Sequence, residues 1–431
     1  MPDMDTIFAL ASARGKSGVA VFRISGPEAF DVAEQMVGAL PPLRRASLRF
    51  IRSADGERLD SGLVVRFAAG ASFTGEDVVE FTVHGSLATV AAVETCLASD
   101  HGLRLAEPGE FTRRALENGV MDLTQVEGLG DLLEAETESQ RKQALRVLDG
   151  AIGKLVSGWR EHLIKAAALV EVSIDFVEED VGNFDDQILD ELVLVLAELN
   201  REIAGQSVRE RVQTGFEIAL VGSVNAGKST LLNALAGREA AITSEIAGTT
   251  RDVIELRMDI AGFAVTLLDT AGLRETDEVI ESIGIERGQK RAIEADIRII
   301  LCDNPDTPPP VEPRQGDIVL FSKADLYPQH IGGVSGVTGE GIDRLLDEIT
   351  RELTQRLPKD GVTVRRRHLQ AMERASGSIQ GAIEKLRVSD YIPELVAADI
   401  RHAMLALDSL IGKVDVEDLL GDIFASFCIG K

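Results

Sequence analysis

The chain has 431 residues, a formal net charge of −26 and 45% hydrophobic residues. This length suggests two to four domains, and the composition excludes a mainly disordered or collagen-like chain. We expect no membrane-spanning helix and no signal peptide, because no apolar run reaches about 18 residues and the opening lacks a basic segment. The three cysteines, Cys96, Cys302 and Cys428, are scattered, which fits neither a disulfide framework nor a zinc cluster and indicates a reducing cytoplasm.

The acidic charge argues against a surface that binds nucleic acid indiscriminately, because such binding depends on Lys and Arg neutralising phosphates. The excess of Asp and Glu is concentrated in residues 119–356. A local basic patch is compatible with this distribution.

Residues 1–118 predict an N-terminal α+β domain. Short β-rich runs and two helical patterns alternate there with turn residues, the strands at 19–24, 62–67 and 77–83 and the helices at 27–37 and 87–98. Strands and helices mixed at this spacing are typical of a compact domain with one sheet.

The rest of the chain divides by the spacing of its apolar residues. Residues 119–213 and 357–431 carry Leu, Ala and Glu at helical spacing. Strand-like and helix-like runs alternate over 214–356, as in a doubly wound α/β domain. We therefore predict a multidomain chain in which an α/β domain is inserted into an all-α domain that is split in sequence.

Residues 222–229 fit the phosphate-loop pattern G-x-x-x-x-G-K-[ST]. An apolar strand, 216–221, precedes the motif and a helical run follows it, which is the context that the motif requires. Its glycines let backbone N–H groups curl around phosphate oxygens. Lys228 supplies a charge at the outer phosphates, and the Ser229 hydroxyl can ligate Mg²⁺.

Further nucleotide elements follow in order. Asp269 and Gly272 form a D-x-x-G motif about 40 residues after the phosphate loop, where the carboxylate can reach the Mg²⁺ shell and the glycine N–H the terminal phosphate. Thr250, between the two motifs, is the natural second hydroxyl for Mg²⁺.

Residues 322–325 read Ser-Lys-Ala-Asp and predict the choice of base. Asp325 can accept two hydrogen bonds from guanine, which adenine cannot supply. The usual pattern begins with Asn, and the shorter Ser322 cannot brace the neighbouring loops as an amide can, so we expect weaker guanine binding without loss of selectivity. The loop that begins at Ser335 is expected to close over the base. These elements together indicate a GTPase with a Ras-like fold.

The residue after Gly272 is Leu273, which cannot orient water as the glutamine of many small GTPases does. Several acidic residues follow in 275–281, and the sequence by itself does not choose among them. Asn225 offers a side-chain carbonyl beside the nucleotide, and a monovalent cation bound there could take the place of an arginine finger.

The whole chain resembles the MnmE (TrmE) family of tRNA modification GTPases. The resemblance is carried by the phosphate loop with Asn225, the runs at 248–252 and 269–274, the N-terminal signatures at 72–77 and 108–115, and the final Cys-Ile-Gly-Lys. It implies three domains: an N-terminal tetrahydrofolate-binding and dimerisation domain (1–118), a helical domain in two parts (119–213 and 357–431) and an inserted GTPase domain (214–356).

The resemblance also implies partners and cofactors. It implies a cytoplasmic homodimer that joins MnmG, an FAD protein, and acts on tRNA without contacting a membrane. GTP, Mg²⁺ and K⁺ would bind the GTPase domains, which close on each other. A 5-formyl- or methylenetetrahydrofolate would supply one carbon for a carboxymethylaminomethyl or aminomethyl group on carbon five of the wobble uridine.

Site residues follow from the same resemblance. Arg23 and Glu80 match the folate contacts, and Val120 stands where the family has a basic residue. Ser229 and Thr250 match the Mg²⁺ ligands, and Glu281 matches the residue that positions water. Potassium would be held by Asn225, Ser244, Ile246 and Thr249. The full set expected to hold GTP and its ions is Asn225, Ala226, Gly227, Lys228, Ser229, Thr230, Ser244, Ile246, Thr249, Thr250, Asp269, Thr270, Ala271, Gly272, Ser322, Lys323, Asp325 and Ser335.

Cys428 lies three residues from the end of the chain, where an incidental thiol is the plain interpretation. The resemblance of the terminal motif to that of the family favours a functional thiol instead. We hypothesise that the Cys428 thiol, with its pKa lowered by Lys431, attacks carbon six of uracil. A second interpretation of the whole chain is a regulatory GTPase switch without modification chemistry of its own.

Overall fold

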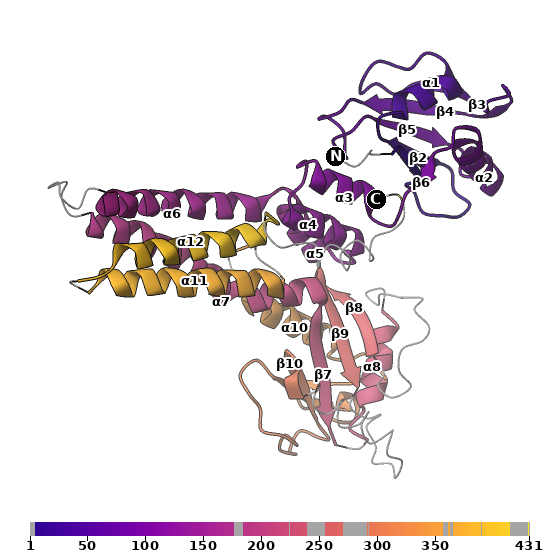
Figure 1. Ribbon diagram of the computed structural model, residues 1–431. Coiled ribbons are helices and arrows are strands. Elements are labelled where there is room, and N and C mark those ends of the chain that lie inside the picture. Colours follow the sequence, from indigo (N-terminus) through magenta and orange to yellow (C-terminus); the bar gives the residue numbers. More distant parts are fainter. Residues whose placement is uncertain are drawn as a thin grey trace, which may run out of the picture. The chain divides into compact units, whose positions relative to one another are not determined.

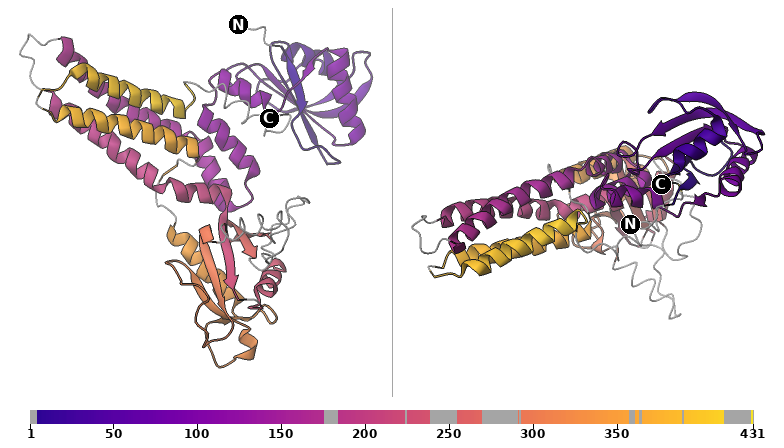
Figure 2. Two further views of the ribbon diagram at one scale, coloured as in Figure 1. Left: turned by 60° about the horizontal axis from the view of Figure 1, so that its bottom comes forward. Right: turned by 45° about the horizontal axis from the view of Figure 1, so that its top comes forward.

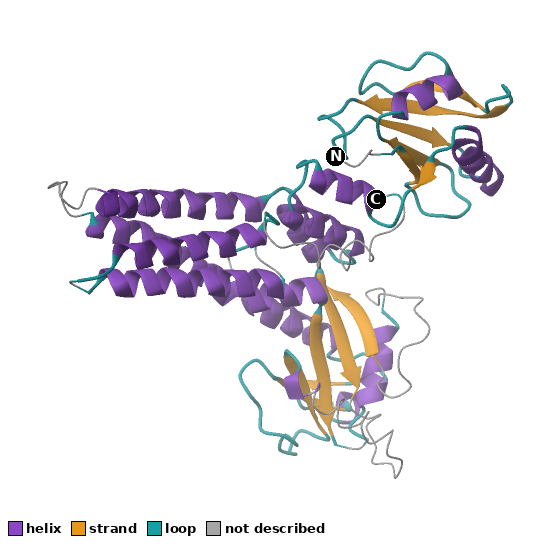
Figure 3. Ribbon diagram, viewed as in Figure 1, coloured by secondary structure: helices purple, strands orange, loops and turns teal. Residues whose placement is uncertain are grey.

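The computed structural model describes residues 5–175, 184–223, 225–238, 255–269, 291, 293–356, 361–362, 365–388, 390–413 and 430. These residues divide into two compact units, one made of residues 1–130, 148–160 and 404–431 and the other of 131–147 and 161–403. Figure 3 shows that each unit combines a β-sheet with helices. The predicted mixture of α+β, all-α and α/β parts is confirmed.

The N-terminal sheet has six strands in the order β3-β4-β5-β2-β1-β6. They are β1 (Ile7–Leu10), β2 (Ala20–Ser25), β3 (Ser47–Arg52), β4 (Arg58–Phe67), β5 (Val78–Val83) and β6 (Arg104–Leu105). Neighbouring strands are antiparallel except for the parallel pair β1–β6. The sequence predicted β2, β5 and part of β4, whereas β1, β3 and β6 were not predicted.

Helices α1 (Ala29–Val37), α2 (Leu87–Thr95) and α3 (Glu110–Glu117) accompany this sheet (Figure 1). The predicted helix at 87–98 ends earlier than expected, because residues Cys96–Asp100 form a π-helical turn. Apolar side chains of β2, β5, α1 and α2 form the core, including Phe22, Phe81 and Met36.

The helical segments are α4 (Leu123–Glu134), α5 (Glu138–Leu148), α6 (Ala151–Asp175), α7 (Asp185–Thr214), α11 (Arg366–Leu386) and α12 (Pro393–Leu410). Helices α4 and α5 are separated by a short break, where the Gln140 side chain accepts hydrogen bonds from the backbone N–H groups of Glu136 and Thr137. Helices α7 and α11 lie side by side although about 176 residues separate their centres (Figure 2). The two parts of the all-α domain, which are separate in sequence, therefore pack against each other.

The inserted domain carries the second sheet, in the order β12-β11-β10-β7-β9-β8. Its elements are β7 (Phe216–Gly222), α8 (Lys228–Ala236), β8 (Glu255–Ile260), β9 (Phe263–Asp269), β10 (Ile297–Cys302), β11 (Ile318–Ser322), a 3₁₀ turn (Ala324–Leu326), β12 (Gly333–Val334) and α10 (Ile342–Arg356). All pairs except β8–β9 are parallel. The carboxyl ends of β7, β9, β10 and β11 therefore meet at one edge, where open α/β sheets bind ligands.

Candidate functional site

The phosphate loop leaves β7 and enters α8 with a backbone that is already curled. Asn225 has a φ of 69° and Gly227 a φ of 82°, both in the left-handed region, and the Gly227 carbonyl accepts a hydrogen bond from Leu231 N–H. The Lys228 ammonium donates to the carbonyls of Gly222 and Ser223, 2.8 Å from each. The lysine therefore connects the two ends of the loop, and its positive charge lies at the loop that is expected to bind phosphate.

Lys228 is almost fully buried, with 6% of its surface exposed. Burial lowers the pKa of its ammonium, and attraction by the carboxylates of Asp269 and Asp303 opposes that shift. Asp269 ends β9 and Asp303 directly follows β10, the two strands that flank β7, and their attraction favours the charged form of the buried lysine.

Ser229 and Asp269 come together as the motifs predict. The Ser229 hydroxyl donates to Asp269 Oδ2 at 2.7 Å, and Asp269 stands opposite Leu220 in the β7–β9 pairing. A hydroxyl and a carboxylate side by side are hard oxygen ligands of the kind that Mg²⁺ prefers. The residues present therefore fit a Mg²⁺ ion bound together with nucleotide phosphates.

The loops expected to hold the base lie at the same edge of the sheet. Lys323 has a φ of 56° and introduces the 3₁₀ turn that carries Asp325. Ser335 is buried and its hydroxyl accepts hydrogen bonds from Val337 and Thr338 N–H. The Ser335 loop therefore has the tight backbone that a base-closing loop needs.

Two close approaches connect the base loops with the phosphate loop. A Cβ placed on Gly336 would lie 2.7 Å from the carbonyl of Thr230, so the Ser335 loop touches the start of α8. A Cβ placed on Gly227 would lie 3.9 Å from the Cβ of Ser322. The buried Ser322 hydroxyl has no hydrogen-bond partner among the described residues, in keeping with the expectation that it braces no loop.

The N-terminal sheet holds the pair expected to contact folate. Arg23 on β2 stands opposite Glu80 on β5, and its Nε donates to Glu80 Oε1 at 2.9 Å. The guanidinium lies over the rings of Phe73 and Phe111, 4.8 and 5.5 Å from their centres. Partly buried charges beside aromatic faces suit a flat, polar ring system.

A buried ionic cluster involves residues of helix α3, which also carries Phe111. Arg114 on α3 lies 3.2 Å from Glu76 and 3.0 Å from Glu110, and all three side chains are nearly inaccessible. Arg104 adds a second contact to Glu110 at 2.6 Å. Glu76, Glu110 and Arg114 belong to the two N-terminal signatures, which also contain Phe73 and Phe111.

Val120 lies beside the loop of the first signature. Its Cγ2 is 3.0 Å from the place where a Cβ on Gly75 would stand, and 39% of its surface is exposed. A valine supplies no hydrogen-bond donor or charge.

Several predicted residues lie outside the described part of the chain: Ser244, Ile246, Thr249, Thr250, Thr270, Ala271, Gly272, Glu281 and Cys428. Gly430 is described, and a Cβ on it would lie 2.3 Å from the carbonyl of Leu10 at the end of β1. Gly430 therefore lies close to the sheet that carries Arg23.

The sequence interpretation missed Asp303, which follows β10 directly. The Ser223 hydroxyl of the phosphate loop donates to Asp303 Oδ1 at 2.5 Å. An acidic residue directly after a buried apolar strand was the available signal, because such a residue lies at the edge where the other site residues gather.

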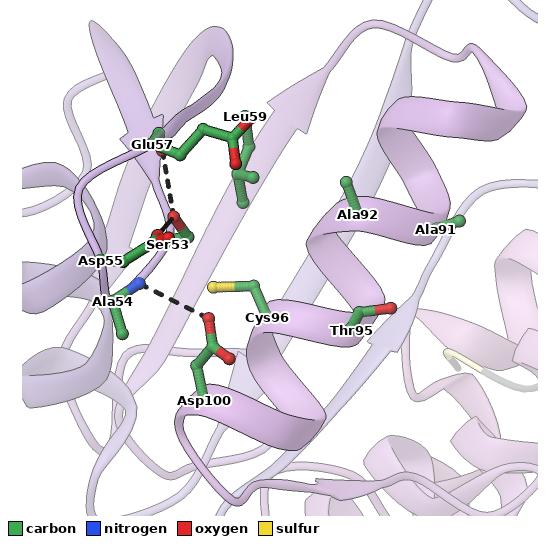
Figure 4. Close-up of a pocket in the computed structure, with 10 residues that line it drawn as sticks. All are labelled: Ser53, Ala54, Asp55, Glu57, Leu59, Ala91, Ala92, Thr95, Cys96 and Asp100. Atoms are coloured by element: carbon green, nitrogen blue, oxygen red, sulfur yellow. Dashed lines mark hydrogen bonds between the residues drawn. The ribbon is translucent and has the colours of Figure 1, made fainter.

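A separate hollow of about 560 Å³ lies between the β3–β4 turn and α2, with Cys96 and Asp100 pointing toward Ser53 and Ala54 (Figure 4). Burial and a hydrogen bond with Asp100 raise the pKa of the Cys96 thiol to about 12. This thiol is therefore protonated and unreactive at neutral pH.

The fold and the site define a phosphate-loop GTPase that carries an additional α+β domain and a split helical domain. The family model of the MnmE helical domain matches residues 123–428, and the model described as GTP-binding protein TrmE N-terminus matches residues 6–120. The chain belongs to the MnmE family. Among the described residues, no helix is long and apolar enough to cross a membrane.

Curated relatives match the chain over nearly its whole length. The tRNA modification GTPase MnmE of Cereibacter sphaeroides is 54% identical and that of Ruegeria pomeroyi 53%, each match covering 99% of this chain and 100% of the relative. Among solved structures, the G domain of the T. maritima FeoB iron transporter covers 32% of this chain and 98% of its own, with 22% identity. Its TM-score of 0.22 is too low to inform the function.

Proposed function

We propose that this protein is the GTP-hydrolysing subunit of a complex that modifies the wobble uridine of tRNA. The observation that carries the proposal is that one chain combines the phosphate-loop contacts of Lys228 and Ser229 with the Arg23–Glu80 pair, and matches tRNA modification GTPases over nearly its whole length. The product would be a carboxymethylaminomethyl or aminomethyl group on carbon five of the base.

In the GTPase site, Lys228 would contact the outer phosphates, and Ser229 with Thr250 would hold Mg²⁺. Asp325 would select guanine through two hydrogen bonds. Glu281 would orient the attacking water through one bridging water, since Leu273 cannot do so. The bond from the γ-phosphorus to its bridging oxygen then breaks as the water oxygen adds.

Potassium is proposed to bind at Asn225, together with Ser244, Ile246 and Thr249. The left-handed Asn225 backbone places a carbonyl-bearing side chain at the phosphate loop, which suits a large monovalent cation. The ion would supply positive charge to the transition state, where other GTPases use an arginine.

This role predicts that GTP hydrolysis is at least about tenfold faster in K⁺ than in Na⁺ at equal ionic strength, a difference of about 1.4 kcal/mol in the barrier. Phosphate release with each chloride salt measures it. An Asn225→Ala variant should lose the difference while still binding GDP. Equal rates of the unaltered protein in both salts would contradict the role given to Asn225.

In the N-terminal domain, we propose that Arg23 and Glu80 bind a tetrahydrofolate that donates one carbon. Gly430 lies close to the end of β1, the neighbour of β2 in the same sheet, which supports a role for the chain's terminal residues at this site. The proposed role of Cys428 is addition to carbon six of the uracil, which makes carbon five nucleophilic.

We further propose a cytoplasmic homodimer that binds MnmG and its FAD. The outer face of β3 and β4 supports dimerisation through the N-terminal domain. Leu48, Phe50 and Leu63 are 45–66% exposed there, and Leu48 and Leu63 are paired across the strands. An apolar face on an edge strand requires cover, which a second copy supplies.

Mass spectrometry of wobble uridines tests the proposed function directly. A deletion strain should lose the modified nucleoside, the intact chain should restore it, and a Lys228→Ala variant should not. Normal nucleosides in the deletion strain would favour the second candidate, a regulatory GTPase switch without modification chemistry.

A further inference from the structure

We propose that Asp303 is a positioning residue of the phosphate loop, which it holds through Ser223 in the shape that binds GTP. The inference rests on the proposed GTPase function and adds a residue outside the phosphate-loop, D-x-x-G and base-recognition motifs. Asp303 acts through the loop and touches no reacting atom.

The first step is the hydrogen bond itself. Ser223 is the first residue of the loop after β7, and its hydroxyl donates to Asp303 Oδ1 at 2.5 Å. A hydrogen bond from a hydroxyl to a carboxylate is about twice as strong as one between neutral groups. It is formed where both groups are partly buried, so water competes with it poorly.

The second step connects Ser223 with the cation that binds phosphate. The Ser223 carbonyl accepts a hydrogen bond from the Lys228 ammonium at 2.8 Å. The side chain of Ser223 is therefore tied to Asp303 while its backbone is tied to Lys228. Movement of this one residue would move the lysine away from the position of the outer phosphates.

The third step is the rigidity of the anchor. Strand β10 pairs with β7 in parallel, with Leu301 opposite Gly222, and a Cβ on Gly222 would lie 2.9 Å from the Leu301 carbonyl. Asp303 follows this pairing by two residues. It is therefore held by the middle of the sheet, whereas the loop that it fixes has no regular structure of its own.

Electrostatics point in the same direction. A carboxylate close to the phosphate site repels the anionic ligand, so its presence there requires a compensating gain. The geometry shows that gain, because Asp303 accepts the hydrogen bond that holds the Ser223 side chain.

The test is a double-mutant cycle on the full chain with Asp303→Ala, Ser223→Ala and the double variant. Direct titration with fluorescent GDP measures affinity, and steady-state hydrolysis separates KM from kcat. Each single variant should raise the KM for GTP and the Kd for GDP about tenfold, with kcat at saturation within about twofold. The double variant should be no worse than either single variant, because both remove one shared hydrogen bond.

Three comparisons make the result decisive. Asp303→Asn keeps an acceptor for Ser223 and should recover most of the affinity. Asp306→Ala removes an exposed carboxylate from the same loop and should change nothing. The proposal would be overturned if the losses of GDP affinity in the two single variants added fully in the double variant. It would also be overturned if Asp303→Asn bound GDP as weakly as Asp303→Ala while Ser223→Ala bound it normally.

The experiment distinguishes a failure of this inference from a failure of the proposed function. Failure of the unaltered protein to bind GTP would sink the function itself. Normal GTP binding by the unaltered protein and by Asp303→Ala would sink only the role of Asp303. A variant with lowered kcat and unchanged KM would indicate loss of folded enzyme, which also contradicts positioning.

Discussion

At the scale of single residues, the site is distinguished by side chains whose surroundings alter their chemistry. Lys228 is a buried cation that donates to two backbone carbonyls and is attracted by two carboxylates. Ser322 is a buried hydroxyl beside the phosphate loop without a partner among the described residues. Lys228 can supply positive charge to a bound phosphate, whereas the Ser322 hydroxyl forms no hydrogen bond within the described part of the chain that would connect the base loop with the phosphate loop.

We expect Ser322→Asn to tighten GDP binding about two- to twelvefold. An amide at this position reaches further than a hydroxyl and can donate to the phosphate loop, and one net hydrogen bond is worth about 0.5–1.5 kcal/mol. Titration with fluorescent GDP measures the change, with Ser322→Ala as the control that should bind nearly as the unaltered protein does. Unchanged affinity in a folded Asn variant would show that the missing bond does not limit binding.

Cysteine reactivity is a second consequence at this scale. Burial raises the pKa of the Cys302 thiol, and burial with Asp100 raises that of Cys96 to about 12. Because the thiolate is the reactive form, both should resist iodoacetamide at pH 7.5 in the folded protein and react after denaturation. Mass spectrometry of the labelled peptides is the measurement. Fast labelling of Cys96 in the native state would contradict its surroundings as described.

At the scale of elements, the β8–β9 hairpin connects the site with the helices. Asp269 ends β9, and at the opposite end of the hairpin the Gly262 carbonyl accepts a hydrogen bond from Ser139 N–H at the start of α5. The side chains of Gln140 and Gln143 in turn donate to backbone carbonyls of α7. The inserted domain is thus attached to the helices at the hairpin as well as through the chain itself.

The hairpin turn predicts a pair of opposite stability changes. Ala261 and Gly262 have φ values of 52° and 87°, and a two-residue turn with both values positive favours Asn-Gly. Ala261→Asn should therefore stabilise the inserted domain by several tenths of a kcal/mol. Gly262→Ala should destabilise it by about 1 kcal/mol.

Thermal unfolding of the two variants beside the unaltered protein checks both signs. The Ala added at position 262 would make ordinary contacts with α5, the nearest being 3.6 Å from Ser139 Oγ, so the backbone strain decides the result. Two shifts of the same sign would refute this account of the turn.

At the scale of the whole molecule, charge is distributed unevenly. The net charge of −26 arises mainly in residues 119–356, so any tRNA must be held by local patches or by a partner. In the N-terminal domain, two arginines, Arg104 and Arg114, form ion pairs with the same buried carboxylate, that of Glu110. The stability of this domain should therefore depend on pH.

Burial would raise the pKa of Glu110, but hydrogen bonds from Arg104 and Arg114 lower it overall. A lowered folded-state pKa gives stability that is complete above the unfolded value of about 4.3 and is lost as the pH falls through the folded value. Hydrogen exchange of N-terminal peptides at pH 7 and pH 3.5 should show faster opening in acid.

A Glu110→Gln variant isolates the contribution of this carboxyl group. It should be less stable at pH 7, because two arginines lose a charged partner, and its exchange should change less between the two pH values. Parallel changes in both proteins would assign the acid sensitivity to other groups.

The sequence by itself determined the class of the protein, because local patterns carry that information. The phosphate loop, the Asp269 motif and Asp325 each combine a residue type with a strand end, and both are readable along the chain. Strands β1, β3 and β6 escaped prediction, since the latter two are mostly exposed and β1 is too short to show a period.

Only the tertiary structure decided which distant residues meet. The pairing of β10 with β7 brings Asp303 to Ser223, the close approach at Gly227 brings Ser322 to the phosphate loop, and the terminal Gly430 reaches β1. No periodicity encodes such contacts, because they depend on which strands are neighbours in the sheet and on how closely their backbones pack. The motifs therefore identify the chemistry, and the sheet decides which side chains support it.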